Sequence, residues 1–312
     1  MAIKNRITQT LGVEYPIVQA PMGYIARAQL ASAVSNAGGL GIIETSSGRL
    51  DEVRTEVKKM RELTTKPFGL NVALAFVRDP DIVKFVLDQG VAFVTTSAGD
   101  PMKIVGPLKQ AGLKVFHVVP SLKTALRAIE AGVDGLVVEG GEGGGFKNPR
   151  EVASMVLLPL VCSKVNVPVI AAGGITDGRT MAAAFALGAE GVQMGTRMVS
   201  AAESPVHQNW KNAILEAEET STVFLNRFGP GPALRALRTQ KTSKYEKEPP
   251  ANIVTEFGNA MNLYFGGDME ASIALSGQVA GRIDSIKPVA QIIAETMEEF
   301  HETIRALSAK YP

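Results

Sequence analysis

Eight short segments rich in β-branched and other apolar residues recur along the first two thirds of the chain, each followed by a turn and an amphipathic stretch. They cover residues 16–20, 40–43, 67–72, 91–95, 114–118, 135–139, 168–172 and 191–194. This alternation is typical of parallel strands joined by helices, and eight strands close a (β/α)8 barrel. The sequence therefore predicts an α/β fold, a TIM (β/α)8 barrel. A doubly wound parallel sheet uses the same alternation and remains the alternative.

The stretches between the predicted strands carry helix signals at both ends. Residues 51–63 combine charged residues with apolar ones at helical spacing, and residues 121–131 begin with Ser121 as an N-cap. Several stretches end in a glycine just before a strand, namely Gly38, Gly90, Gly112, Gly132 and Gly188. Because glycine suits the left-handed residue that closes a helix, these positions predict a repeated strand, helix and turn unit.

The alternation stops after residue 204. Residues 205–265 contain a predicted helix over 205–219 and the turn Gly229-Pro230-Gly231-Pro232, and Gly266-Gly267 follow as a hinge. We therefore predict two units: a barrel of residues 1–204 and 266–312, and a substrate cap of residues 205–265 inserted after the eighth strand. A long helix over residues 288–309 is expected to close the chain.

The composition excludes several classes of protein. The 312 residues include 32 Lys and Arg against 31 Asp and Glu, and this net charge of +1 gives no overall field that would attract nucleic acid or an anionic membrane. No signal peptide is evident, and no run reaches the ~20 apolar residues that cross a bilayer, so a cytoplasmic protein is expected. The single cysteine, Cys162, is expected to be a buried thiol without a catalytic role. The sequence leaves open whether the protein forms a homodimer.

Glycine follows the last two predicted strands, where barrels often bind phosphate through backbone N–H groups. Gly173 and Gly174 come after the seventh strand, and Gly195 and Thr196 come after the eighth. Either pair alone fits an ordinary tight turn. Two such turns at these two strand ends predict a phosphate site.

The sixth predicted strand opens into the glycine-rich loop 139–145. Glycine loses much backbone entropy on ordering, so this loop is expected to become ordered against a planar ligand; a flexible linker is the alternative. His117 ends the fifth strand and is either a catalytic residue or a packed one. The 3 histidines form no cluster with metal-ligand spacing, so no metal is predicted.

Seven segments together resemble the nitronate monooxygenase family, formerly called 2-nitropropane dioxygenase, which includes flavin-dependent enoyl-acyl-carrier-protein and enoyl-CoA reductases. They are residues 19–22 (QAPM), 67–71 (PFGLN), 118–121 (VVPS), 139–145 (EGGEGGG), 170–179 (IAAGGITDGR), 194–197 (MGTR) and 275–281 (LSGQVAG). The resemblance covers nearly the whole chain.

The resemblance implies FMN at the C-terminal mouth of the barrel, with a small second domain over it. It places Ala20, Pro21 and Met22 beside the isoalloxazine ring and Asn71 near the ring. The other implied cofactor residues are Glu139 and Gly144 in the loop after the sixth strand, and Ala172, Gly173, Gly174, Met194, Gly195 and Thr196 around the phosphate. A single phosphate needs only one cradle of N–H groups.

The chain departs from the family at one important position. The family sequence usually continues Gly-Gly-His, and that His acts as a base or hydrogen-bond donor, whereas this chain reads Gly144-Gly145-Phe146-Lys147. Phe146 cannot transfer a proton, and Val118 stands where some nitronate monooxygenases have Lys. The candidate catalytic positions are therefore His117, Lys147 and Phe146.

Three functions follow from these residues. The first is FMN-dependent oxidation of alkyl nitronates with O2, because a nitronate is already a carbanion and needs no general base. The alternative is an NAD(P)H-dependent enoyl-thioester or enone reductase, and the second alternative is a non-catalytic flavin-binding protein. In the cap, Phe224, Phe228, Leu234 and Leu237 are expected to face the flavin, and Arg235 and Arg238 to meet solvent or an anionic group of the substrate.

Overall fold

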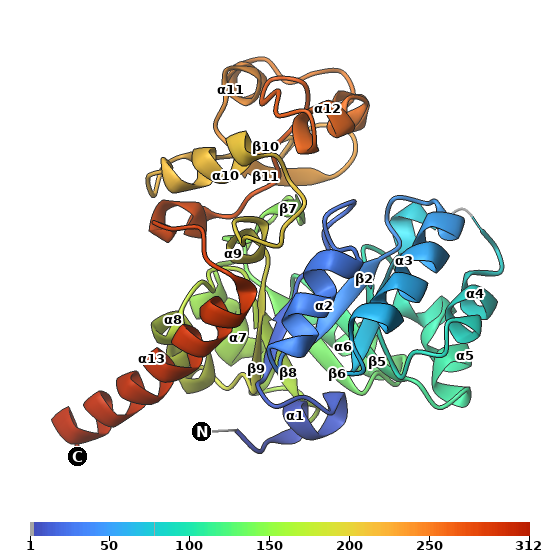
Figure 1. Cartoon of the computed structure of the whole chain (residues 1–312), viewed down its shortest axis with the longest axis vertical. Helices are drawn as coiled ribbons and strands as arrows, with labels where there is room; N and C mark the ends of the chain where they lie inside the picture. Colours follow the sequence, from blue (N-terminus) through green and yellow to red (C-terminus); the bar gives the residue numbers. More distant parts are fainter. Residues whose placement is uncertain (1–2, 78) are drawn as a thin grey trace.

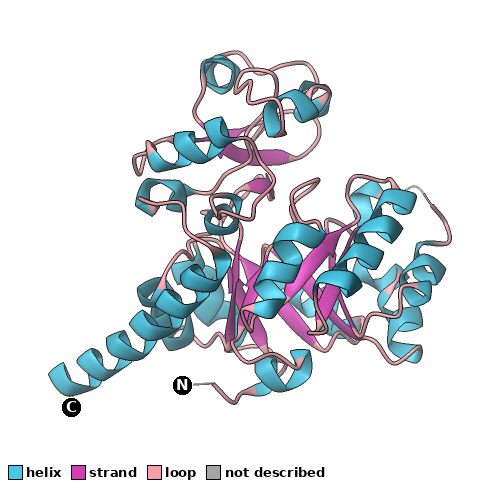
Figure 2. Ribbon diagram, in the orientation of Figure 1, coloured by secondary structure: helices cyan, strands magenta, loops and turns pink. Residues whose placement is uncertain are grey.

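Eight parallel strands form the body of the protein in the computed structural model, which describes residues 3–77 and 79–312 (Figures 1 and 2). The strands are β1 (Ile17–Gln19), β2 (Gly41–Glu44), β3 (Phe68–Ala73), β4 (Phe93–Ser97), β5 (Lys114–Val119), β6 (Gly135–Glu139), β8 (Val169–Ala172) and β9 (Gly191–Met194). Their order in the sheet is β1-β9-β8-β6-β5-β4-β3-β2. From β2 to β9, strands that follow one another along the chain, apart from β7, are therefore neighbours in this sheet. All eight predicted strands are confirmed.

The sheet closes on itself between its two ends, β1 and β2. Val18 forms a parallel bridge with Leu40, and the Leu40 N–H donates to the Ile17 carbonyl at 2.9 Å. The side-chain amide of Gln19 also donates to the Ile42 carbonyl across this seam at 3.0 Å. A closed series of neighbouring strands is a barrel and not a doubly wound sheet, which reverses its strand order at a switch point.

Helices cover the outside of the barrel, as the strand and helix alternation predicts (Figure 1). They are α2 (Ala28–Asn36), α3 (Leu50–Leu63), α4 (Ile82–Asp88), α5 (Val105–Gln110), α6 (Leu122–Glu130), α7 (Ser154–Cys162), α8 (Gly178–Ala186) and α13 (Val289–Lys310). The Ser121 hydroxyl caps α6 by accepting from the Thr124 N–H. The five glycines predicted to close helices, Gly38, Gly90, Gly112, Gly132 and Gly188, all have positive φ.

Side chains along each strand alternate between two hydrophobic cores. Val18, Phe116 and Ile170 pack inside the barrel, whose lower end is closed by Ile7 and Leu11 of α1 (Arg6–Leu11). The residues on either side of them along the strands pack outward against the helices. This alternation, called strand parity below, determines which side chains point toward the barrel axis at the C-terminal ends of the strands. These C-terminal ends are the upper ends in Figure 1.

A second, three-stranded antiparallel sheet lies beyond the upper strand ends (Figure 2). Its order is β10-β11-β7, with β10 (Thr222–Leu225) and β11 (Ala233–Leu237) from the region after β9 and β7 (Gly145–Lys147) from the loop after β6. The same region contains α10 (Gln208–Leu215), α11 (Gln240–Lys247), η3 (Ile253–Phe257) and α12 (Ala260–Tyr264). The helix expected over residues 205–219 is thus shorter than predicted.

The remaining elements are short connections and the closing helix. The short ones are η1 (Leu74–Phe76), η2 (Pro101–Lys103), α9 (Thr196–Val199) and η4 (Gln278–Arg282). The buried residues of α13 all lie between Val289 and Phe300, and its C-terminal half projects from the body (Figure 1). Within the described residues, no helix combines the length and the apolarity that a membrane span requires.

Candidate functional site

Polar side chains gather at the upper ends of the barrel strands. By strand parity, Glu44, Asn71 and Thr95 point toward the axis on one side, and Glu139 and Gln193 do so on the other. The Asn71 amide donates to the Thr95 hydroxyl at 2.9 Å, which fixes its position in the mouth. Gln193 is 6% exposed, and its Oε1 has no hydrogen-bond partner among the described residues. The barrel therefore presents a polar mouth with an unsatisfied acceptor.

The predicted phosphate cradle lies at the ends of β8 and β9. Gly173 and Gly174 have φ of +82° and +77°, and in the described part of the chain their N–H groups and that of Gly195 have no protein acceptor. A Cβ on Gly173 would lie 3.0 Å from the Gly140 carbonyl oxygen and 3.1 Å from the Gly143 nitrogen. Only glycine allows the backbones of the two loops to approach this closely. Three N–H groups without a protein acceptor, on glycines that are each partly exposed, suit an anion.

Thr196 binds a second loop of the protein, a contact that the sequence did not indicate. Its hydroxyl accepts from the Gly277 N–H at 2.8 Å and is therefore already used within the protein. A Cβ on Gly144 would lie 2.6 Å from the carbonyl carbon of Ser276, so the glycine-rich loop packs directly on the same segment. The loop after β6, the cradle and residues 276–277 thus form one packed unit.

Glu142 organises the glycine-rich loop, a role that sequence reasoning missed. Its carboxylate accepts from the Ser154 N–H and hydroxyl at 2.9 and 2.8 Å, at the first residue of α7. The loop carbonyl at Glu142 also accepts from the Gln278 N–H at 2.9 Å. The sequence does not predict this contact, because Glu142 and Ser154 are twelve residues apart and meet only when the loop folds back on the start of α7.

Glu44 supports the loop that holds Ala20, Pro21 and Met22. This buried carboxylate accepts from the Tyr24 N–H at 3.1 Å and forms an ion pair with Arg27 at 3.0 Å. The Ala20 N–H donates to the Met194 carbonyl at 2.9 Å. Ala20, Pro21 and Met22 are all partly exposed beside the mouth. Glu44 is the last residue of β2 and lies two residues after the inward-facing Ile42, so the alternation along the strand could have predicted that Glu44 points into the mouth.

Lys147 and Phe146 leave β7 on opposite sides. The Lys147 side chain is 4% exposed, and its Nζ lies 2.5 Å from Oε1 of Glu139. The Phe146 ring contacts Phe76 and Phe257, with ring centroids 5.2 and 5.8 Å away. An aromatic cluster therefore surrounds Phe146, and the buried Lys147 ammonium lies on the other side of β7 beside Glu139.

The placement of His117 argues against the predicted role as acid or base. Parity turns its ring out of the barrel interior, because Phe116 and Val118 pack inside, and its Nδ1 lies 2.7 Å from the Thr96 hydroxyl oxygen. Burial lowers the pKa of His117 to about 4, so the ring is neutral at pH 7. Met194 also packs its side chain outward in the helix-facing core, and only its backbone is available to the mouth.

The expected roles of several cap residues are wrong. Arg235 is buried, forms an ion pair with Glu151 at 2.8 Å and donates to the Gly141 carbonyl at 2.8 Å, so it does not meet solvent. Arg238 pairs with Glu246 and keeps 41% of its side chain exposed, so it does meet solvent as expected. Leu234 lies in the hydrophobic core of the three-stranded sheet, whereas Phe228 is 96% exposed.

Cys162 is half-buried instead of buried. Burial raises the pKa of its thiol above the ordinary value, which keeps it in the unreactive protonated form. In the described parts of the chain, no group of three or more His, Cys, Asp or Glu side chains could hold a metal ion.

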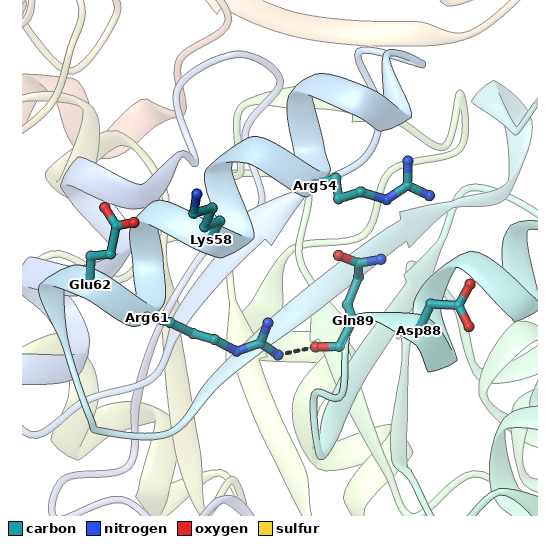
Figure 3. A pocket seen from close by; sticks show the side chains of 6 residues that line it. All are labelled: Arg54, Lys58, Arg61, Glu62, Asp88 and Gln89. Carbon is teal, nitrogen blue, oxygen red and sulfur yellow. Dashed lines mark hydrogen bonds between the residues drawn. The ribbon is translucent and has the colours of Figure 1, made fainter.

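Two hollows on the outer surface contain none of the predicted site residues. One, of about 380 Å³, lies between α3 and the end of α4 and is lined by Arg54, Lys58, Arg61, Glu62, Asp88 and Gln89 (Figure 3). There the Arg61 guanidinium donates to the Gln89 carbonyl. The other, of about 430 Å³, includes Asp177, Arg282 and Glu295. Both are lined mainly by charged side chains, and in the second hollow Arg282 pairs with Asp177 and Lys287 with Glu295. Because neither hollow lies at the strand ends, neither replaces the barrel mouth as candidate site.

Comparison with known proteins identifies the family to which the chain belongs. The family model described as nitronate monooxygenase matches residues 4–299. The chain is 38% identical over 249 residues, covering 79% of this chain and 69% of the relative, to a (3aS,4S,5R,7aS)-5-hydroxy-7a-methyl-1-oxo-octahydro-1H-indene-4-carboxyl-CoA dehydrogenase of Mycobacterium tuberculosis. It is 32% identical to a probable nitronate monooxygenase of Staphylococcus saprophyticus, covering 80% of this chain and 84% of that protein.

Solved structures extend the comparison to the whole fold. FabK from Thermotoga maritima superposes with a TM-score of 0.93 at 41% identity, covering 99% of both chains. A nitroalkane oxidase from Streptomyces ansochromogenes gives a TM-score of 0.85 at 25% identity, covering 97% of this chain and 100% of that one. Sequence and structure thus lead to one conclusion: the chain belongs to the nitronate monooxygenase family and is an oxidoreductase.

Proposed function

We propose that this oxidoreductase holds FMN in the barrel mouth and oxidises alkyl nitronates with O2, releasing nitrite and leaving a carbonyl compound. The cradle supports FMN because Gly173, Gly174 and Gly195 offer free backbone N–H groups to one phosphate. Ala20, Pro21 and Met22 would lie along the ring, with Asn71 and Gln193 supplying polar contacts from the strand ends. When bound, the flavin supplies the electron transfer.

The replacement of imidazole by the Phe146 ring carries this proposal. Phe146 is packed against Phe76 and Phe257 and has no proton to exchange. A nitronate already carries the negative charge that a base would create from a nitroalkane, so it needs only binding and orientation. A site without a positioned base therefore suits the anionic substrate better than the neutral one.

A second candidate is an NAD(P)H-dependent reductase of enoyl thioesters. A relative at 38% identity is named as acting on a carboxyl-CoA compound, and FabK superposes over nearly the whole chain. In that reaction a proton must reach the carbon next to the thioester, and Lys147 or water would supply it. The choice between the two reactions depends on the electron donor.

Anaerobic bleaching of the yellow holoprotein distinguishes the candidates. Under the proposal, propionate 3-nitronate or an alkyl nitronate reduces the flavin, and admission of O2 restores the spectrum with release of nitrite. Rapid bleaching by NADH or NADPH, with slow or no reaction of nitronates, would support the reductase instead. Bleaching by none of these donors would contradict both.

Residues 205–265 form the substrate cap in this proposal, and the substrate is a small molecule. The three-stranded sheet lies over the upper strand ends, and Phe257 contacts Phe146 from that side (Figure 2). The cytoplasm remains the expected location.

A further inference from the structure

Lys147 is a buried cation with unused hydrogen-bonding capacity. Its side chain is 4% exposed, and among the described residues its Nζ makes no hydrogen bond of good geometry. Glu139 is its one ion-pair partner there, at 2.5 Å. An ammonium has three N–H donors, and burying them without acceptors costs free energy. The structure therefore leaves donors at this position for a further acceptor.

The space beside Lys147 belongs to the barrel mouth. Glu139 ends β6, points toward the axis by parity, and keeps 24% of its side chain exposed. A Cβ on Gly143 would lie 2.5 Å from the Lys147 Nζ and 2.8 Å from the Glu139 Oε1. Gly143 therefore leaves room for the Lys147–Glu139 ion pair, which lies next to the proposed flavin site.

Other largely buried cations near the upper strand ends, namely Arg27, Arg197 and Arg235, already donate hydrogen bonds within the protein. Arg27 is held by Glu44, and the Arg197 guanidinium donates to the Ser285 carbonyl at 2.9 Å. Arg235 is held by Glu151 and by the Gly141 carbonyl. Unlike these cations, Lys147 makes no hydrogen bond of good geometry among the described residues, and its ion-pair partner Glu139 points into the mouth.

We propose that Lys147 binds the delocalised oxyanion on which the reaction depends. This inference rests on the proposed function only for the location of the site, since both candidate substrates present the same chemistry: the two oxygens of a nitronate, or the enolate oxygen of a reduced thioester. Lys147 acts by charge and hydrogen bonding and transfers no proton, so of the two proton sources named for the reductase reaction this inference selects water. Glu139 holds the ammonium in place and limits its attraction for anions.

Binding of an inert oxyanion to the FMN-loaded protein tests this role without turnover. Isobutyrate, the carboxylate isostere of the 2-nitropropane nitronate, represents the nitronate, and acetoacetyl-CoA represents the thioester enolate. The dissociation constant follows from the perturbed flavin absorbance. Lys147→Met should weaken binding of the accepted probe about 10- to 100-fold, as expected for a charge-assisted hydrogen bond. Lys147→Arg should restore most of the affinity, because it restores the charge.

Glu139→Gln supplies a test of opposite sign. Loss of the competing carboxylate should tighten binding of the anionic probe about 3- to 10-fold. Lys109→Met is the matched control, because Lys109 also pairs with a carboxylate, Asp134, but on the outside of the barrel; its probe affinity should match that of the unmodified protein.

Two results would overturn the proposal: unchanged probe affinity in flavin-loaded Lys147→Met, or weaker binding in Glu139→Gln. If Lys147→Met does not retain flavin, Glu139→Gln and Lys147→Arg decide the question by themselves. Binding of acetoacetyl-CoA but not isobutyrate, with the predicted effects at Lys147 and Glu139, would keep this inference and reject nitronates as substrates.

Discussion

The guanidinium of Arg235 lies 2.8 Å from the carboxylate of Glu151, and this contact joins β11 to the segment that follows the glycine-rich loop. The same guanidinium donates to the Gly141 carbonyl within the loop. Arg235 therefore positions the loop and is not available to the substrate.

Replacement of Arg235 by Ala should affect all substrates alike. It leaves the Gly141 carbonyl and Glu151 without their buried partner, and we expect a loss of about 2 to 3 kcal/mol in unfolding free energy and weaker flavin binding. Arg238→Ala is the control, because Arg238 and Glu246 are both about 40% exposed and such pairs contribute little. Urea unfolding and flavin titration measure the two effects. A selective loss of thioester binding in Arg235→Ala would contradict the positioning role.

The strands and the glycine turns after β8 and β9 could be predicted from the sequence, and the supporting contacts could not. Parallel strands buried on both faces appear as short apolar runs, and the glycines of the cradle follow two of them directly. β7 gave no such signal, because Gly145–Lys147 becomes a strand only by pairing with Ala233–Arg235 far along the chain. The burial of Arg235 depends on that pairing. The outward direction of His117 was predictable from its apolar neighbours on β5.

Substitution of Gly173 by Ala should lower flavin affinity at least 10-fold. The left-handed backbone costs about 1 kcal/mol with any side chain, and the added Cβ would also press on Gly140 and Gly143. Gly112→Ala is matched for the backbone cost, because Gly112 has φ of +85° but no atom within 4 Å of the added Cβ. Flavin titration by fluorescence should separate the two variants, whereas equal affinities would place the phosphate elsewhere.

Phe146→His should raise activity on neutral nitroalkanes about 100-fold while changing nitronate oxidation little. The family resemblance implies that a base stands at this position, and only the nitroalkane needs deprotonation. The gain should grow with pH through the ordinary titration range of histidine. Phe146→Leu controls for lost contacts with Phe76 and Phe257. Equal turnover of nitroalkane and nitronate by the unmodified protein would indicate a base elsewhere in the mouth.

His117 should make the protein less stable as pH falls from 6.5 toward 4. Its pKa is about 4 in the folded protein because of burial, whereas the unfolded chain binds the proton near 6.5. The unfolded state thus takes up more protons in this window, which removes about 2 to 3 kcal/mol of unfolding free energy by pH 4. Urea unfolding at several pH values should give a flatter profile for His117→Gln. An unchanged slope would mean that the ring is not buried in its neutral form.

The pairing of β7 with β11 also limits how such an enzyme can be modified. The stretch that carries Phe146 and Lys147 is an edge strand of the sheet formed with residues 222–237, although about 75 residues separate them in the chain. A chimera that receives residues 205–265 from a relative would place a foreign edge against the native β7. Exchange of specificity between members of this family should therefore succeed only when residues 140–151 and 205–265 are transplanted together, as two discontinuous pieces of one module.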